Sequence, residues 1–344
     1  MHFTTSRVLG SALAAVVAWT GCGNLSASAD INIYSYRQES LIKPQLDAFT
    51  KATGIKYNLV TGSAGGLLQR LKSEGANSPA DMLFTADVGN LWRAKDAGVL
   101  KPVQSDVLEK HIPARFRDPE GTWYGLGIRV RAIFYNVDKV KPAELSTYED
   151  LADPKWKGKV LIRSSSNIYN QSLLASLIHH HGKAKAEAWA AGVVANLARK
   201  PQGGDTDQLR ALAAGEGAVA VSNSYYYGRL LDSDAAKDKK VTEKIRIFWP
   251  NQSGRGAHAN VSGAGVTKAS KNTEEAVKLL EFLVGEQAQH IYSDVGYEFP
   301  VRPGVAPSKI VAGMGEFKMD PVPIQVYGEN NAEAVRIFDR VGWR

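Results

Sequence analysis

Short apolar runs alternate with amphipathic segments in the first part of the chain after residue 30. The runs have the length and the β-branched content of buried strands, and in the segments between them apolar residues recur at helical spacing. The predicted order is strand 31–34, helix 40–53, strand 55–60, helix 67–74, strand 80–84 and helix 90–97. This alternation predicts an α/β fold with a parallel sheet and right-handed crossovers.

Two later segments are strand-like and lie far apart in the sequence. Residues 123–135 form a long extended run, and residues 261–266 belong to a return segment rich in glycine, alanine and serine. Because both are strands rather than flexible tethers, we expect the chain to cross twice between two lobes. The other predicted elements are strands at 160–162 and 218–221 and helices at 168–181, 273–284, 287–295 and 330–341.

The N-terminal residues 1–29 have the pattern of a secretory signal peptide. They contain one charged side chain, Arg7, followed by an apolar run and a small-residue cleavage site that ends at Ala29. The alternative is lipid attachment at Cys22, but the bulky Trp19 is a poor residue for such a site. We therefore predict an exported protein, with cleavage of the leader after Ala29.

Charge and cysteine content narrow the chemistry that the exported chain can perform. The formal net charge is +7 at pH 7, and removing Arg7 with the leader lowers it to +6. No dense basic block accompanies this charge, so we expect no nucleic-acid partner. Cys22 is the single cysteine and would leave with the leader, so a thiolate metal site is excluded.

The candidate chemistry centres on the segment 221–231, VSNSYYYGRLL. Asn223 and Ser224 are residue types that cap helices, so the three tyrosines are expected in the first turn of a helix that follows a buried strand. Neighbouring helix positions differ by about 100° in direction, which allows two tyrosines to converge while the third turns away. Tyr169 lies at the start of another predicted helix, after the polar loop 163–167.

Tyrosines gathered at such a junction have two possible roles. They can simply pack or stack against an organic ligand, as aromatic residues usually do. Alternatively, deprotonated phenols can bind a small, highly charged, hard cation such as ferric iron, and a helix N-terminus favours the phenolate form. The residues alone leave both roles open.

Other polar clusters have structural explanations that compete with functional ones. Arg129 and Arg131 are two residues apart on a predicted strand and therefore share a face, either in internal ion pairs or as an anion site. Residues 179–181 are three histidines at a helix end, where they suit the negative pole of the helix dipole better than a metal site. The glycine-rich loop 61–66 matches no nucleotide-binding fingerprint and is interpreted as a turn.

Several of these motifs together resemble the bacterial ferric-iron-binding proteins that serve ABC importers. The resemblance extends from about residue 31 to the C-terminus. Its motifs are IYSYR at 33–37, RVRAIFYN at 129–136, SSNIYNQS at 165–172, SNSYYYGRL at 222–230 and FPVRPGV at 299–305. The resemblance implies a type II periplasmic binding protein fold, with two α/β lobes joined by two hinge strands. Each lobe is then expected to contain a mixed, mostly parallel sheet flanked by helices.

The same resemblance implies lobe boundaries. The N-terminal lobe is expected to comprise 30–128 plus 263–310, and the C-terminal lobe 129–262 plus 311–344. The expected partners are an inner-membrane permease and its ATPase, and the expected protein is a monomer with no enzymatic activity.

Matched motif by motif, the resemblance implies that Tyr169, Tyr225 and Tyr226 hold Fe(3+). Arg129 would help to bind carbonate or a similar anion, and Arg37 and Arg229 are weaker candidates for that role.

The chain departs from the family pattern at one place. Many members carry an iron-binding His or Tyr just after the Y-S-x-R stretch, where this chain has Gln38 and Glu39. The chain therefore resembles the subgroup that uses three tyrosines, and Tyr36, Gln38 and Glu39 remain possible contacts from the N-terminal lobe.

Two alternative ligands use the same expected fold. An oxyanion could bind at the helix starts near 164–167 and Ser224, helped by Arg129 and Arg131. A polyamine could bind on the aromatic stretch, although the tyrosines have no clustered carboxylates near them in the sequence.

Overall fold

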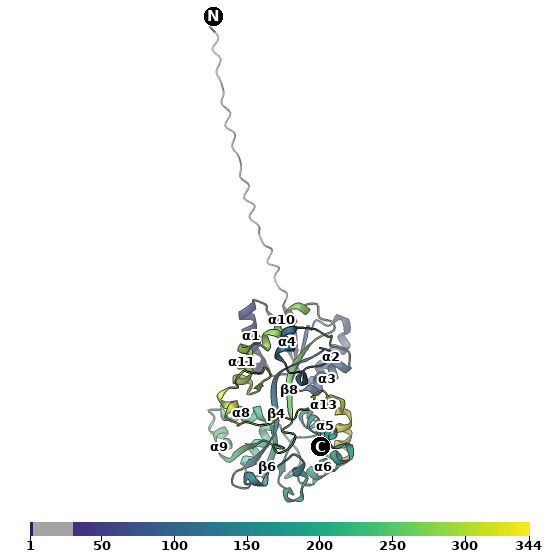
Figure 1. Cartoon of the computed structure of the whole chain (residues 1–344), viewed down its shortest axis with the longest axis vertical. Helices are drawn as coiled ribbons and strands as arrows, with labels where there is room; N and C mark the ends of the chain where they lie inside the picture. Colours follow the sequence, from purple (N-terminus) through teal and green to yellow (C-terminus); the bar gives the residue numbers. More distant parts are fainter. Residues whose placement is uncertain (3–29) are drawn as a thin grey trace.

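The computed structural model describes residues 1–2 and 30–344. The predictions about the signal peptide and about Cys22 concern residues 3–29 and lie outside the described residues. In Figure 1 the first strands and helices form the upper half of the molecule, and strands β4 and β8 run from it toward the lower half. Within the described residues, no helix is both long enough and apolar enough to cross a bilayer.

The first strands and helices follow the predicted β-α-β order. Strand β1 (Ile31–Ser35) pairs in parallel with both β2 (Tyr57–Thr61) and β3 (Met82–Thr85). The intervening helices are α1 (Glu39–Thr53), α2 (Ala64–Glu74) and α3 (Val88–Asp96). Helix α1 ends at Gly54, as predicted, because its φ of 76° lies in the left-handed region that glycine adopts without steric cost.

Strand β4 (Tyr124–Asn136) is the longest in the fold and connects its two halves. It pairs antiparallel with β8 (Ala259–Val266) through its first part and with β6 (Val219–Asn223) and β7 (Ile245–Phe248) through its last part. The sheet order is β2-β1-β3-β8-β4-β6-β5. The sheet is therefore mixed: pairing is parallel from β1 to β3 and between β5 (Val160–Leu161) and β6, and antiparallel around β4.

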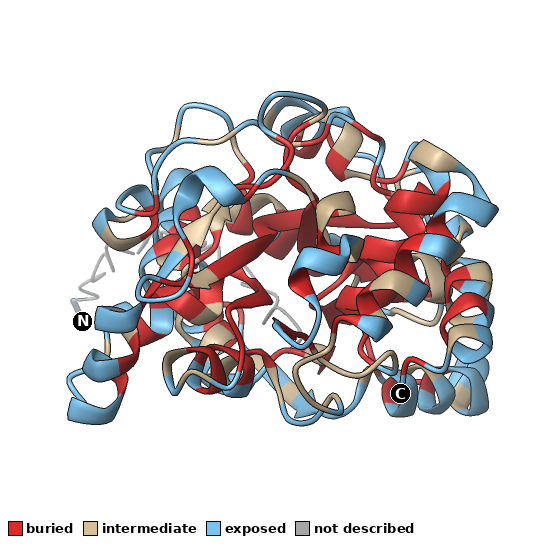
Figure 2. Ribbon diagram, turned by 90° about the horizontal axis from the view of Figure 1, so that it is seen from below, coloured by how far each residue is buried: buried red, intermediate tan, exposed pale blue. Residues whose placement is uncertain are grey.

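Helices cover the sheet and enclose the core. Buried residues are concentrated in the central strands and the inner faces of the helices, and exposed residues lie at the periphery (Figure 2). The remaining helices are α4 (Asp106–His111), α5 (Ile168–His181), α6 (Lys183–Ala195), α7 (Asp205–Ala213), α8 (Ser224–Leu231), α9 (Ala236–Lys244), α10 (Thr273–Leu283), α11 (Glu286–Gly296), α12 (Lys309–Ala312), α13 (Val326–Glu329) and α14 (Asn331–Val341). A two-residue strand, β9 (Phe299–Pro300), and five short 3-10 turns complete the described fold.

Helix α5 is buried along most of its length, from Ile168 to Ile178. Its neighbours explain this, because α6, α13 and α14 pack against it. The C-terminal segment thus returns to the half of the molecule that contains α5. The division into lobes and its boundaries stay a prediction.

Candidate functional site

Two strand- or loop-to-helix junctions present tyrosines to the same place, and they are built differently. At the start of α5, Asn167 caps the helix by accepting a hydrogen bond from the Tyr169 backbone N–H at 3.2 Å. At the start of α8, neither predicted cap acts as one: Asn223 Oδ1 accepts a hydrogen bond from Arg131, and Ser224 Oγ accepts one from the Val130 N–H. Asn223 does occupy the N-cap position of α8, as expected, but its side chain does not cap the helix, because strand β4 lies close enough to compete for both side chains.

The tyrosines that the sequence singled out converge. The hydroxyl oxygens of Tyr169 and Tyr225 are 3.3 Å apart, and the rings of Tyr225 and Tyr226 lie 4.1 Å apart between centroids. All three line one cavity of about 140 Å³. One of the three consecutive tyrosines was expected to turn away; it is Tyr227, which packs against Phe134.

Burial and a nearby cation set the protonation of these phenols. Tyr169 and Tyr225 are only 5% and 6% exposed, and burial raises the pKa of both well above the usual value for a phenol. Both are therefore neutral hydrogen-bonding groups at neutral pH when nothing is bound. The guanidinium of Arg129, 5.0 Å from the Tyr169 ring centroid, opposes this effect and favours the phenolate.

The two arginines of strand β4 face the same region but have different environments. Arg131 forms an ion pair of 2.6 Å with Asp205, which also contacts Arg163 at 3.2 Å, so the structural explanation holds for Arg131. Arg129 lies 3.9 Å from Asp87, and its buried Nε has no hydrogen-bond partner among the described residues. The Nε of Arg131 also has no partner among the described residues, but of the two arginines only Arg129 lines the tyrosine cavity.

The opposite wall of the cavity comes from the N-terminal part of the chain and from residue 298. Arg37 is 4% exposed and forms a 2.6 Å ion pair with Glu298, while its Nε and Nη2 have no partner among the described residues. Burial by itself would lower the pKa of Arg37, but Glu298 raises it, so the guanidinium stays charged. Tyr36 and Gln38 also line the cavity.

Two further predicted site residues lie at the margin. Glu39 begins α1, is exposed and does not line the cavity, so the structure does not bring it to the site. Arg229 is exposed but does line the cavity. Sequence analysis missed Glu298, together with Leu41 and Ala86, because Glu298 precedes a motif far along the chain and nothing local marks it.

Two of the three histidines at residues 179–181 pair with carboxylate side chains. His180 contacts Asp320 at 2.6 Å and His181 contacts Glu149 at 2.7 Å. Across the described residues, no group of three or more His, Cys, Asp or Glu side chains is placed to hold a metal ion. The tyrosine cavity offers a different donor set, phenol oxygens, which are hard ligands once deprotonated.

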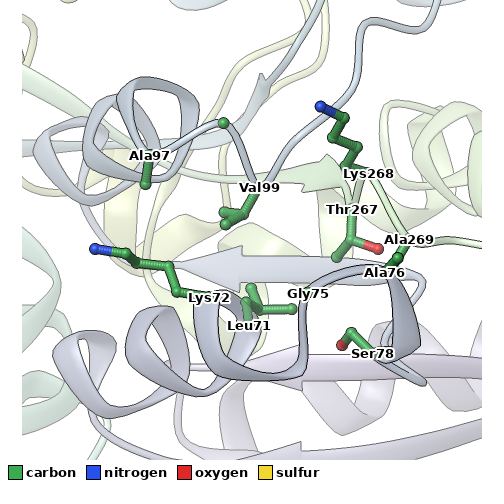
Figure 3. Close-up of a pocket in the computed structure, with 11 residues that line it drawn as sticks. Leu71, Lys72, Gly75, Ala76, Ser78, Ala97, Val99, Thr267, Lys268 and Ala269 are labelled. Atoms are coloured by element: carbon green, nitrogen blue, oxygen red, sulfur yellow. The ribbon is translucent and has the colours of Figure 1, made fainter.

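A larger cavity of about 640 Å³ lies elsewhere, between α2, the start of the loop after α3, and the residues that follow β8. Small and apolar residues form most of its wall, and Figure 3 shows Lys72 and Lys268 extending in different directions. It contains no tyrosine, carboxylate or arginine. The tyrosine cavity is therefore smaller, but it is the one of these two cavities that is lined by tyrosine, arginine and carboxylate side chains.

Comparison with known proteins agrees with this geometry. The family model for bacterial extracellular solute-binding proteins matches residues 77–312. Iron uptake protein A1 of Synechocystis sp. is 51% identical over 315 residues, covering 92% of this chain and 88% of that protein.

Two solved structures share the fold over most of the chain. The structure of IdiA (FutA) from Trichodesmium in complex with iron and citrate ligands has a TM-score of 0.89 and 52% identity, and covers 92% of this chain and 100% of that one. The ferric binding protein from Campylobacter jejuni has a TM-score of 0.88 and 44% identity, with coverage of 92% and 100%. The chain therefore belongs to the family of bacterial extracellular solute-binding proteins and has their two-lobed type II fold.

Proposed function

We infer that this protein binds ferric iron in the tyrosine cavity and delivers it to an inner-membrane ABC importer. The observation that carries this inference is the 3.3 Å separation of the Tyr169 and Tyr225 hydroxyl oxygens in a cavity that Tyr226 also lines. Two buried phenol oxygens this close can share one small cation. The relatives whose names refer to iron uptake and ferric binding support the same ligand.

The charges of the cavity suit a trivalent ion. Tyr169, Tyr225 and Tyr226 would each lose a proton on binding, and three phenolates neutralise Fe(3+). Ferrous iron would leave an excess negative charge in a mostly buried site, which is unfavourable. Arg129 and Arg37, with their unpartnered guanidinium nitrogens, would hold carbonate or another anion that completes the coordination.

The cavity walls come from both halves of the chain, which gives iron a way to favour a closed arrangement. A ligand shifts a conformational equilibrium only if it contacts the closed state better than the open one. Tyr36, Arg37 and Gln38, which line the cavity, would provide those extra contacts. The role in the periplasm is capture and transfer by a monomer, with a membrane permease and its ATPase as partners.

A ferric titration tests the binding site directly. Protein beginning at Asp30 is titrated with ferric iron supplied as a weak chelate, and visible absorbance is recorded. Iron-bound phenolate gives a charge-transfer band that neither component shows alone, and we expect it to saturate at about one iron per chain. Tyr226→Phe should weaken or shift the band and lower the affinity by about 100-fold or more, since it removes an anionic ligand.

Tyr227→Phe is the matched control. Its ring packs away from the cavity and its hydroxyl donates only a long hydrogen bond of 3.4 Å to the Ile245 carbonyl. The titration of this variant should equal that of the unmodified protein. If no band forms and the iron stays with the chelate, the ferric assignment is wrong, and oxyanions and polyamines become the next ligands to test.

A further inference from the structure

Glu298 is the single carboxylate among the residues that line the tyrosine cavity, and it is almost completely buried. Its two oxygens have different partners. Oε1 forms the 2.6 Å ion pair with Arg37, and Oε2 accepts a hydrogen bond from the hydroxyl of Ser262 on strand β8. Arg37 and Ser262 are themselves buried. One carboxylate therefore joins a residue of the cavity wall to a strand that runs between the two halves of the molecule.

Ser262 lies at a crossing of three strands. Its register partner on β4 is Gly127, which also pairs with Pro300 of β9. The register of the β4–β8 pairing shifts between Gly125 and Gly127, as it does at a β-bulge. Such an irregularity bends a strand and changes the direction of the side chains around it. Glu298 is thus bonded to the place where β4 changes its course between the halves.

Gly127 leaves the space that this carboxylate occupies. A Cβ atom at position 127 would collide with Oε2 of Glu298 and would lie 3.3 Å from the hydroxyl oxygen of Ser262. Glycine weakens a strand, and within one it often marks the close approach of another group. Here the approaching group is the carboxylate of Glu298.

A second side chain from the same part of the chain also holds the irregularity. Gln289 of α11 donates a hydrogen bond of 2.8 Å to the carbonyl of Leu126, which lies between the two glycines. Its amide oxygen accepts a hydrogen bond of 2.8 Å from the N–H of Val301. Gln289 does not line the tyrosine cavity. Of these two side chains, Glu298 is therefore the one that connects the crossing to the cavity.

The position of the Arg37 guanidinium depends on Glu298. Among the described residues, Glu298 is the one side chain to which Arg37 donates a hydrogen bond, and the Nε and Nη2 of Arg37 are buried without a partner. The ring of Tyr292, whose centroid is 5.7 Å from the guanidinium carbon, supports it from one side. A ligand that bonds to the free nitrogens of Arg37 is therefore connected through Glu298 to Ser262 and β8.

We propose that Glu298 is a positioning residue that holds Arg37 in the cavity wall and connects it to the crossing of β4, β8 and β9, so that binding in the cavity stabilises this crossing. The inference rests on the proposed iron-binding function. Glu298 acts through Arg37 and not as an iron ligand, because both of its oxygens already have partners. A carboxylate that only neutralised Arg37 would need neither the bond to Ser262 nor the space at Gly127.

Hydrogen exchange of the backbone amides at residues 125–129 tests this connection. The protein beginning at Asp30 is compared with and without ferric iron, and the iron charge-transfer band is recorded on the same samples. In the unmodified protein we expect iron to slow this exchange by about tenfold or more, because a bound ligand suppresses local opening of the segment that it stabilises.

Ser262→Ala is the decisive variant, because it keeps the ion pair between Arg37 and Glu298 and removes only the hydrogen bond to β8. The iron band should be retained, and the protection by iron should fall to about threefold or less. Glu298→Gln should also lose the protection, since a neutral amide does not hold the guanidinium as a carboxylate does. Thermal unfolding confirms that each variant is folded.

Ser222→Ala is the matched control. Ser222 is a buried serine on β6, which also pairs with β4, but its hydroxyl donates a hydrogen bond to the neighbouring Asn223 carbonyl at 3.3 Å. This variant should keep the full protection by iron.

The inference is wrong if Ser262→Ala or Glu298→Gln keeps the protection of the unmodified protein, because Glu298 would then only balance the charge of Arg37. It is also wrong if Ser222→Ala loses the protection equally, or if the unmodified protein shows the iron band without any protection at residues 125–129. In each of these cases the proposed function stands. The absence of the iron band from the unmodified protein would instead overturn the proposed function and this inference with it.

Discussion

The two walls of the tyrosine cavity differ in how their polar groups are held. On the wall built by α5 and α8, Tyr169 and Tyr225 are buried and in mutual contact, and Arg129 is fixed on the long strand β4 beneath them. On the wall that follows β1, Tyr36 is half-buried and Gln38 is exposed, and only Arg37 is fully buried. The first wall is preformed. In the second wall only Arg37 is held in place by burial, and Tyr36 and Gln38 remain accessible to solvent.

This difference separates the two tasks of a binding protein that must later release its ligand. A rigid wall provides donor atoms at fixed positions, so that little conformational entropy is lost on binding. An accessible wall can come into contact with the ligand and leave it again. We therefore expect most of the affinity for iron to come from the α5–α8 wall, and the contacts of the β1 wall to determine how strongly iron favours the closed arrangement.

The pH dependence of iron affinity should show the largest effect, because it acts on the preformed wall. Burial raises the pKa of Tyr169 and Tyr225, so each carries a proton near neutrality that iron would displace if, as proposed, it binds there. The affinity for iron should therefore fall as the pH falls, by up to about three decades per pH unit if iron displaces one proton from each of three phenols. Competition against a chelator of known protonation measures this slope.

The Tyr226→Phe variant sharpens this measurement. With one phenol fewer, its slope should drop to about two decades per pH unit. An unmodified protein whose affinity does not change with pH would show that the phenols are not deprotonated ligands.

Substitutions of the two buried cavity arginines, Arg129 and Arg37, should change the iron affinity by an intermediate amount and test the difference between the walls. Arg129→Gln should weaken iron binding by about 100-fold, because it removes the charged donor proposed to hold the bound anion, and a hydrogen bond to a charged group contributes about 1.5–3 kcal/mol. Arg37→Gln should cost about tenfold or less, because Glu298 at 2.6 Å already balances the Arg37 charge.

Affinity and thermal unfolding should be measured on the same samples of both variants. Arg129→Lys, which keeps the charge, should retain more affinity than Arg129→Gln. Equal losses for Arg37→Gln and Arg129→Gln would mean that the two walls contribute alike.

The smallest effect is expected at the accessible edge of the β1 wall. Gln38→Ala removes a neutral, exposed side chain that lines the cavity, and should change iron affinity by about threefold or less. Glu39→Ala is the control, because Glu39 is exposed and does not line the cavity. A loss of 100-fold in Gln38→Ala would show that this residue is an iron ligand in the closed arrangement.

Much of the fold followed from local patterns. The β-α-β start, the end of α1 at Gly54 and the bounds of α5 agree closely with the expected elements, since apolar periodicity and capping residues act over a few neighbouring positions. Helix geometry likewise predicted that one of the three consecutive tyrosines turns away, although not that it is Tyr227. The boundaries of several strands shifted by one or two residues, and the antiparallel pairing around β4 had no local signal.

The sequence by itself determined which residue types were available for chemistry: tyrosines at two helix starts, a pair of arginines on one strand and no cysteine in residues 30–344. Only the tertiary structure decided how they are used. In the folded chain Arg131 forms an ion pair with Asp205, whereas Arg129 lines the tyrosine cavity. Glu298 forms an ion pair with Arg37, although the two residues are far apart in the sequence. It also engaged Asn223 with β4 instead of with its own helix. The physical reason is that ion pairing and burial depend on distances between residues remote in sequence, which no local pattern encodes.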